Sequence, residues 1–149
     1  MRAVIQRVSR AEVKVEGKTT GAIKCGLVVL LGVHKGDTDR DVIWLSDKIV
    51  HLRIFDDRQG KMNRSLLETC GEMLVVSQFT LLGDCRKGRR PSWSQAAGPA
   101  LAEKFYLDFI SRVSAHGISV QTGKFQTMME VTLTNDGPVT LLLDSYKQF

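Results

Sequence analysis

The segment NDGPVT (residues 135–140) places the tightest local constraint on the backbone of this chain. Pro138 has a fixed φ and no N–H to donate, so it cannot be an ordinary member of a strand ladder. Gly137 has no Cβ and accepts backbone conformations that are closed to other residues. The segment follows an alternating run (129–134) and precedes an apolar run (141–143), which predicts a reversal between two strands. From these residues alone, the Gly137–Pro138 bond is expected to be trans.

Two interpretations of this corner stay open at the level of the residues. It is an ordinary surface turn, or it is a rigid element, poor in side chains, whose backbone carbonyls gauge the shape of a small ligand.

Hydrophobic periodicity predicts an α+β fold in a single domain that spans residues 1–149. Apolar residues recur at helical spacing in residues 38–51 and 99–117, and both segments carry helix-capping residues. The many strands and two amphipathic helices favour a mostly antiparallel sheet or flattened β-barrel with two main helices packed on one side. The strands are expected at residues 3–8, 11–15, 21–23, 27–33, 52–55, 73–76, 118–121, 127–134 and 141–143.

The composition limits where in the cell the protein can be and which partners it can bind. No apolar run reaches the ~20 residues of a membrane helix, and the first residues lack a signal-peptide core, which predicts a cytoplasmic protein without membrane contact. The 3 cysteines are scattered, and no histidine stands at a zinc-like spacing from them. We therefore expect free thiols, no metal and no cofactor. The net charge of +5 suits an anionic partner such as RNA, but charge alone does not identify one.

The predicted buried strand 73–76 turns polar at its end, at Ser77, Gln78, Phe79 and Thr80. A strand end is where a scaffold presents hydroxyls, amides and backbone N–H groups to a ligand, although a polar strand terminus without a ligand fits equally well. A nucleophilic Ser77 or Thr80 would need an adjacent general base. The histidines of this chain stand in no Gly-x-Ser-x-Gly elbow or similar signature, so a catalytic triad is not favoured.

A basic segment follows this polar strand end closely, so both are expected near one rim of the sheet. It places four cations within five positions, followed by a proline and an aromatic residue: Arg86, Lys87, Arg89, Arg90, Pro91 and Trp93. Cations beside an aromatic ring suit contacts with phosphates and bases. A solvated loop is the alternative interpretation. Further along, Phe125 is expected in the core or as a pocket wall, and no P-loop or dinucleotide fingerprint is present.

Two motifs together resemble the signatures of the D-aminoacyl-tRNA deacylases, formerly called D-tyrosyl-tRNA deacylases: SQFTL at 77–81 and NDGPVT at 135–140. Each motif is short, but the pair in this order is specific. The likeness also runs through residues 1–8, 26–33, 61–63, 90–92 and 122–125. The chain departs from the family pattern at Gln126 and Thr127, where small residues are usual, and at Trp93, where phenylalanine is usual.

The resemblance implies a homodimer with its active site at the subunit interface and an aminoacylated tRNA as substrate. The Gly137–Pro138 bond would be cis and would enter the partner subunit's pocket, where its carbonyls engage the amino group of a D-aminoacyl moiety and exclude L side chains. The further substrate-binding residues that the resemblance implies are Asn135, Val139, Thr140, Phe125, Met129 and Arg7, with Arg7 bracing the loop.

The same resemblance assigns a catalytic role to residues 77–80. They would hold the terminal adenosine, and the backbone N–H groups near Gln78 and Phe79 would stabilise the oxyanion of ester hydrolysis. No side chain would act as nucleophile, because the 2′-hydroxyl of the terminal ribose would assist the attack. The implied reaction releases a free D-amino acid and tRNA, and extends to glycine mischarged on tRNA-Ala. The implied tRNA-binding residues are Arg86, Lys87, Arg89 and Arg90.

Two other functions remain compatible with the residues. The first is a side-chain esterase that uses Thr80 or Ser77 as nucleophile on a small substrate. The second is a non-catalytic RNA-binding module, which the basic charge suggests.

Overall fold

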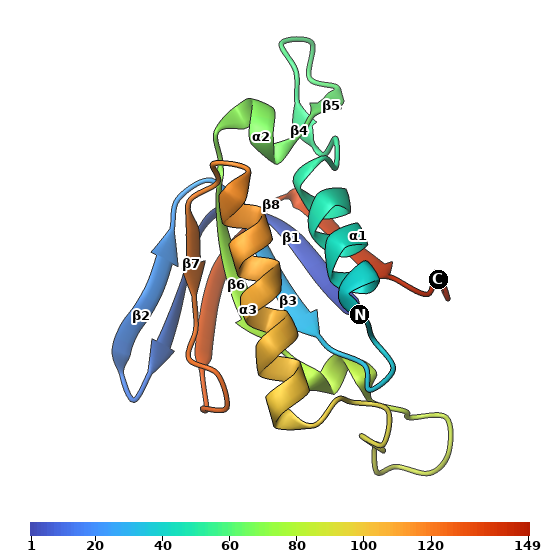
Figure 1. Cartoon of the computed structure of the whole chain (residues 1–149). Coiled ribbons are helices and arrows are strands. Elements are labelled where there is room, and N and C mark those ends of the chain that lie inside the picture. The colour runs from blue at the N-terminus through green and yellow to red at the C-terminus, as the bar shows by residue number, and fades with distance from the viewer.

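The computed structural model describes residues 1–149 as a six-stranded sheet with helices on one face (Figure 1). The strands of the sheet are β1 (Arg2–Val15), β2 (Lys18–Ile23), β3 (Gly26–Gly32), β6 (Glu72–Ser77), β7 (Val120–Thr122) and β8 (Glu130–Asp144). The helices are α1 (Asp39–Val50), α2 (Leu66–Thr69) and α3 (Pro99–Ala115), and a 3₁₀ turn, η1, spans Phe79–Leu82. A separate small hairpin pairs β4 (Phe55–Asp56) with β5 (Met62–Arg64).

The sheet is mixed and nearly closed. Its order is β2-β1-β3-β6-β7, and β8 pairs with the long strand β1. β1 pairs antiparallel with β2, β3 and β8, whereas the β3–β6 and β6–β7 pairs are parallel. The parallel pairs arise because the chain returns through α1 and then α3, and parallel strands need such crossovers. A Cβ on Gly21 of β2 would lie 2.6 Å from the Thr122 carbonyl oxygen of β7, so the two edges of the curled sheet touch.

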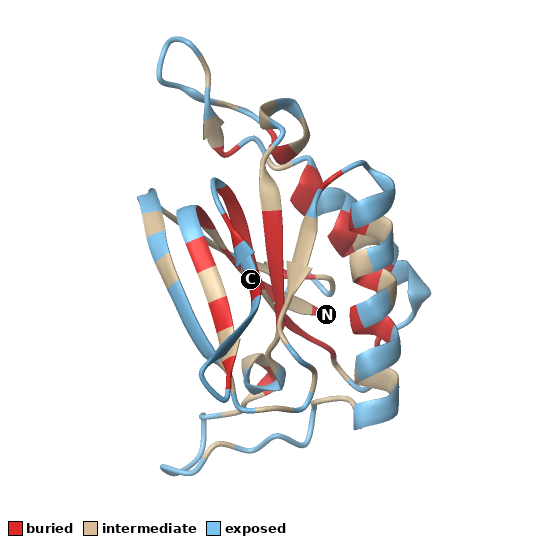
Figure 2. Ribbon diagram, turned by 90° about the vertical axis from the view of Figure 1, so that its left-hand side faces the viewer, coloured by how far each residue is buried: buried red, intermediate tan, exposed pale blue.

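The predicted α+β fold with two main helices on one side is confirmed. The apolar stripe of α1 and that of α3 are both buried against the same face of the sheet, and Figure 2 shows the buried positions on the inward sides of these helices. A second, smaller cluster fills the interior of the curled sheet; it consists of Val8, Ala11, Val13, Ile23, Val28, Leu74 and Val76. No helix is long and apolar enough to cross a bilayer.

Several predicted elements differ from the structure. The expected strands 3–8 and 11–15 are one strand, β1, because the exposed Ser9 and Arg10 interrupt the alternation at a register shift and not at a turn. The expected strand 52–55 is wrong except at Phe55. The short elements β5 and α2 were not predicted, since elements of three or four residues carry no measurable periodicity.

The predicted reversal at residues 135–140 is wrong. β8 continues in one direction along β1, with Asn135 opposite Val8 and Thr140 opposite Gln6. The residues between these two pairs bulge out of the ladder. Pro138 has no N–H for a ladder bond, and a bulge is where a sheet tolerates such a residue without ending the strand.

Candidate active site

The structure gathers the sequence-predicted site residues into two clusters. The first, which we call the corner, is the bulge 136–139 of β8 with its supports Arg7, Asn135 and Thr140. The second, which we call the rim, is residues 77–80 together with the basic loop 84–93 that follows them. The rim lies where β3, β6 and β7 end side by side, at the lower end of the sheet in Figure 1.

The side chain of Asn135 closes the base of the corner. Its Nδ2 donates to the backbone carbonyl of Arg7 at 2.8 Å and to that of Val139 at 3.0 Å, and its Oδ1 accepts from the Thr140 hydroxyl at 3.2 Å. One amide thus ties both ends of the bulge to each other and to β1. The Gly137–Pro138 peptide bond inside the bulge is cis, which corrects the residue-based expectation of a trans turn.

Arg7 supports the corner from beneath. Its side chain is only 8% exposed, and its Nη1 donates to the Ile54 carbonyl at 2.7 Å. Its Nε lies 3.2 Å from the Asp136 carboxylate, and Asp56 is a second carboxylate within 3.5 Å. A buried guanidinium with several partners cannot easily move, because each donor left unpaired would lose a charged hydrogen bond.

Gly137 is required at the corner for two reasons. Its φ is +110°, a value that residues with a Cβ rarely adopt, and a Cβ there would lie 2.7 Å from Nη2 of Arg7. Asp136, Gly137 and Pro138 are all exposed. The corner therefore exposes backbone groups at the surface of the chain, and Arg7 and Asn135 hold these groups in place.

In the rim, β6 passes into η1 at Gln78. The N–H of Gln78 donates to the Leu31 carbonyl at 2.8 Å, so the structure removes it from the expected oxyanion donors. The N–H groups of Phe79 and Thr80 open the 3₁₀ turn, where the first N–H groups have no partner within the turn. Within η1, these two N–H groups are the backbone donors available to an oxyanion.

The Thr80 hydroxyl has no general base beside it. Its hydrogen-bond partner is the side-chain amide of Gln78, which donates to it. An amide cannot take the proton that a nucleophilic hydroxyl must lose. Ser77 is half-buried at the end of β6, and no hydrogen bond joins its hydroxyl to a histidine or a carboxylate.

Aromatic residues and cations surround the rim. Phe79 packs edge-on against Trp93, with ring centroids 5.5 Å apart, and both rings are exposed. The basic loop pairs one of its cations internally: hydrogen bonds from the side chain and then the backbone of Arg86 hold the pKa of Asp84 well below its usual range. The other three cations of the loop, Lys87, Arg89 and Arg90, are exposed and form no ion pair.

Phe125 and Met129 lie on the segment between β7 and β8. Phe125 packs against Tyr106 with ring centroids 5.9 Å apart, and Met129 packs on the smaller core cluster beside Gly123.

Gln126, one of the departures from the family pattern, has a φ of +56°, which explains why a glycine suits this position. Its side chain is exposed, and the neighbouring Thr127 hydroxyl donates to the Lys124 carbonyl at 2.9 Å.

The corner and the rim do not meet within one chain. The corner lies beside Arg7 of β1. Ser77 aligns with Leu31 of β3, which aligns with Ala3 of β1. Two strands therefore separate the clusters, which lie roughly 14 Å apart across the strands and about 13 Å apart along them.

Sequence reasoning named only Arg86 from a set of polar residues beside the rim. They line a cavity of about 760 Å³ and come from four separate parts of the chain: Arg2, His34, Asp84, Arg86, Gln95 and Gln148. No local motif joins them, and only the folded chain brings them together. No group of three or more His, Cys, Asp or Glu side chains is arranged to hold a metal ion.

Comparison with known proteins gives consistent matches over the whole chain. The family model described as D-Tyr-tRNA(Tyr) deacylase matches residues 4–144. A D-aminoacyl-tRNA deacylase of Thermosipho africanus is 60% identical over 149 residues, which are 100% of both chains. One from Desulfatibacillum aliphaticivorans is 62% identical over 145 residues, 97% of this chain and 99% of the relative.

Two solved structures also match nearly the whole chain. A c-Myc DNA unwinding element binding protein superposes with a TM-score of 0.91 at 39% identity, over 97% of this chain and 98% of the other. A probable eukaryotic D-amino acid tRNA deacylase superposes with a TM-score of 0.82 over 95% of this chain and 97% of the other. Its identity of 19% makes it a match of fold alone.

Proposed function

The chain belongs to the D-Tyr-tRNA(Tyr) deacylase family, and we propose that it hydrolyses the ester bond of D-aminoacyl-tRNA to a free D-amino acid and tRNA. The observation that carries the proposal is the match of about 60% identity over the full length to D-aminoacyl-tRNA deacylases. The corner and the rim supply the geometry for the mechanism that follows.

The corner acts as a chiral sieve. Its carbonyls bind the amino group of the aminoacyl moiety, and an L side chain would point into backbone that Arg7 and Asn135 hold in place. Rejection by fixed backbone is effective because adjusting side chains cannot relieve the collision. Glycine has no side chain to reject, so the same sieve admits glycyl-tRNA, including glycine mischarged on tRNA-Ala.

The rim carries out the hydrolysis. The terminal adenosine lies against residues 77–80, and the N–H groups of Phe79 and Thr80 face the ester carbonyl oxygen. The 2′-hydroxyl of the terminal ribose assists a water molecule in its attack, and the two N–H groups stabilise the resulting oxyanion. The bond between the carbonyl carbon and the ribose oxygen then breaks, and that oxygen takes a proton. The absence of a base beside Thr80 supports a route without a side-chain nucleophile.

The active site is completed by a second copy of the chain. Support comes from the separation of corner and rim and from the exposure of the corner. β8 pairs with β1 alone, and Leu142 on it is 59% exposed beside half-buried Val4. An uncovered apolar strand edge is suited to an interface between copies. The exposed cations Lys87, Arg89 and Arg90 contact the tRNA backbone next to the rim.

The proposed function is tested with two charged tRNAs that differ only in the handedness of tyrosine. Purified protein is expected to deacylate D-Tyr-tRNA and to leave L-Tyr-tRNA intact, as measured by the fraction of tRNA that remains charged. Equal hydrolysis of both, or hydrolysis of neither, would contradict the proposal. Salt-sensitive tRNA binding without any hydrolysis would instead support an RNA-binding module, for which the net charge of +5 is the only support.

The alternative of a side-chain esterase is tested by Thr80→Ala. We expect this variant to keep kcat for D-Tyr-tRNA within about tenfold of the wild type, because the substitution removes no general acid or base. A nucleophilic Thr80 predicts a loss of about 10⁴-fold or more in single-turnover hydrolysis. Ser77→Ala is the matched hydroxyl deletion, and circular dichroism and tRNA binding verify that both variants are folded.

A further inference from the structure

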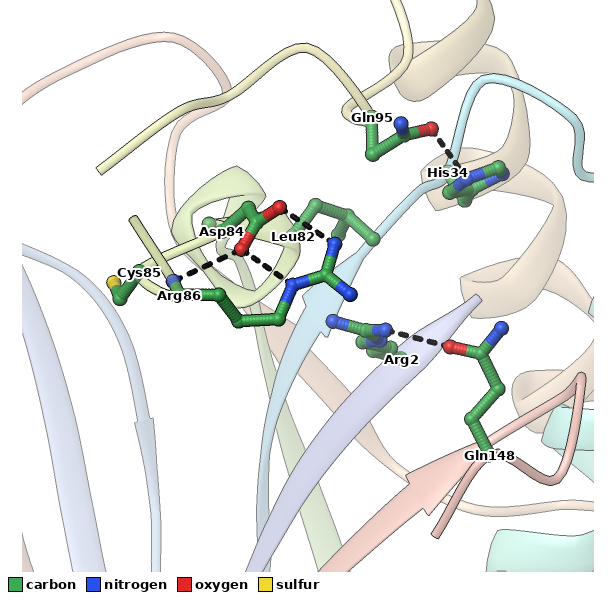
Figure 3. A pocket seen from close by; sticks show the side chains of 9 residues that line it. Arg2, His34, Leu82, Asp84, Cys85, Arg86, Gln95 and Gln148 are labelled. Carbon is green, nitrogen blue, oxygen red and sulfur yellow. Dashed lines mark hydrogen bonds and ion pairs between the residues drawn. The ribbon is translucent and has the colours of Figure 1, made fainter. Parts of the chain in front are cut away.

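A polar cavity of about 760 Å³ lies directly beyond η1 and is not used by the mechanism above (Figure 3). Its walls come from the first strand, the loop after β3, the basic loop and the C-terminal segment. Figure 3 shows two guanidinium groups, an imidazole and two side-chain amides around it. The lining residues that matter are Arg2, His34, Asp84, Arg86, Gln95 and Gln148.

His34 sets the orientation of one amide. Its Nδ1 accepts the backbone N–H of Gly36 at 3.0 Å, so the ring proton is on Nε2. That Nε2–H donates to Oε1 of Gln95 at 3.2 Å. Oε1 therefore accepts one hydrogen bond, and the NH₂ group of Gln95 has no partner in the chain and is a free donor at the cavity.

Arg2 provides further free donors. Its guanidinium donates to Asp144, to the Leu81 carbonyl and to Oε1 of Gln148, at 2.9, 3.1 and 3.0 Å. A guanidinium has five N–H donors, so two are left over. Oε1 of Gln148 accepts this bond from Arg2, and the NH₂ group of this second amide has no partner in the chain.

Every side-chain acceptor of the cavity already receives at least one hydrogen bond from within the chain. Both carboxylate oxygens of Asp84 accept from Arg86, and the amide oxygens of Gln95 and Gln148 each accept one bond. The cavity thus offers unpaired donors from Arg2, Gln95 and Gln148 and no unpaired side-chain carboxylate. These free donors match a ligand that is rich in acceptors, and the cations of the adjacent loop favour a negative charge.

The position of the cavity indicates the source of such a ligand. Leu82 and Gly83, which line it, are the end of the turn that Phe79 begins. A 3₁₀ turn rises about 2 Å per residue, so the cavity starts roughly 6 Å beyond the proposed adenosine site. The nucleotide joined to the terminal adenosine reaches this far. A cytosine presents two neighbouring acceptors, O2 and N3, and its phosphodiester adds acceptors with negative charge.

We propose that this cavity binds the cytidine nucleotide that precedes the terminal adenosine of the substrate, with Gln95, Gln148 and Arg2 donating to its base and phosphate. The inference rests on the proposed function and extends it from one nucleotide of the tRNA to two. Uracil fits less well, because its N3–H is a donor that meets the donors of the cavity.

The test compares three small esters of D-tyrosine: D-Tyr-adenosine, D-Tyr-CpA and D-Tyr-UpA. Wild-type protein is expected to hydrolyse D-Tyr-CpA with a kcat/KM about tenfold above that for D-Tyr-adenosine, the size of one good base contact. D-Tyr-UpA is expected to fall between them. Gln95→Ala and Gln148→Ala should each lower the ratio of kcat/KM for D-Tyr-CpA to kcat/KM for D-Tyr-adenosine toward one. Gln59→Ala removes an exposed glutamine in the β4–β5 hairpin and is the matched control for this ratio.

The outcomes separate the inference from the function on which it rests. If D-Tyr-tRNA itself is not hydrolysed, the proposed function fails. If D-Tyr-tRNA is hydrolysed but the three esters react equally, or both cavity variants keep the wild-type ratio, only the inference is overturned. Free CMP should inhibit D-Tyr-CpA more than D-Tyr-adenosine. CMP binding at the cavity without any advantage for D-Tyr-CpA would assign it to a free mononucleotide and overturn the proposal.

Discussion

Replacing Gly137 by alanine is expected to lower kcat/KM for D-Tyr-tRNA by about 100-fold while the protein stays folded. The new Cβ would lie 2.7 Å from Nη2 of Arg7 and 3.0 Å from Cγ2 of Val139. Arg7 cannot retreat, because the Ile54 carbonyl and the Asp136 carboxylate hold its guanidinium. The corner must therefore move outward, and a displacement of about 1 Å in a positioning element is enough for a loss of this size.

A control separates this displacement from simple backbone strain. Gly17, in the turn between β1 and β2, has a φ of +74°, and a Cβ added to it would meet no atom within 4 Å. Gly17→Ala therefore imposes the strain of a positive φ, about 1–2 kcal/mol, without a collision and away from the corner. Both variants should unfold at reduced temperatures, but only Gly137→Ala should lose activity. Equal activity of the two variants would remove the corner from the mechanism.

Mixing two inactive variants is expected to restore about a quarter of wild-type activity, because corner and rim of one site come from different subunits. Gly137→Ala impairs the corner and Phe79→Ala impairs the rim, where loss of a stacking ring weakens binding of a base. Phe79 is 55% exposed, so its truncation does not damage the core. After co-refolding, about half of the dimers are mixed, and each mixed dimer contains one site with both parts intact. The measurement is the initial rate with D-Tyr-tRNA before and after subunit exchange.

The reverse mixture gives the opposite result and serves as the control. The double variant Gly137→Ala/Phe79→Ala is co-refolded with an equal amount of wild type. If the parts act across subunits, each mixed dimer has two impaired sites, and activity falls to about a quarter of the all-wild-type value. If both parts of a site come from one chain, about half of the all-wild-type activity remains. A shared site predicts recovery in the first mixture and a quarter of the activity in the second. No recovery of activity in the first mixture would contradict a site shared between subunits.

The long apolar periodicities were the predictable part of the fold. The stripes that include Val42, Leu45 and Ile49 in α1 and Phe105 and Phe109 in α3 repeat over several turns, so each helix was recognisable from its own residues. The strands β3 and β6 were recognisable from their uninterrupted apolar runs. The parallel pairing of β3 with β6 was not predictable, because it depends on the path of the long connection between the two strands.

Part of the candidate site was also predictable from the sequence, and part was not. The motif residues around Gly137 and Phe79 were identified from the sequence, because each motif is contiguous and local. The backbone N–H of Gln78 was expected among the oxyanion donors, but it donates to the Leu31 carbonyl on a neighbouring strand, a pairing that the sequence does not show. The cavity beside η1 carried no sequence signal, because residues as distant as Arg2 and Gln148 line it together.

The sequence by itself determined the two long helices, the family resemblance and a proline where a strand ladder cannot be regular, since these depend on the chemistry of neighbouring residues. Only the tertiary structure decided that the corner is a bulge within β8 and not a reversal, because β1 supplies partners on both sides of it. It also decided that corner and rim stand apart in one chain, with β1 and β3 between them. The physical reason is that strand pairing brings together residues far apart in the sequence, and no local pattern specifies which strands will be neighbours.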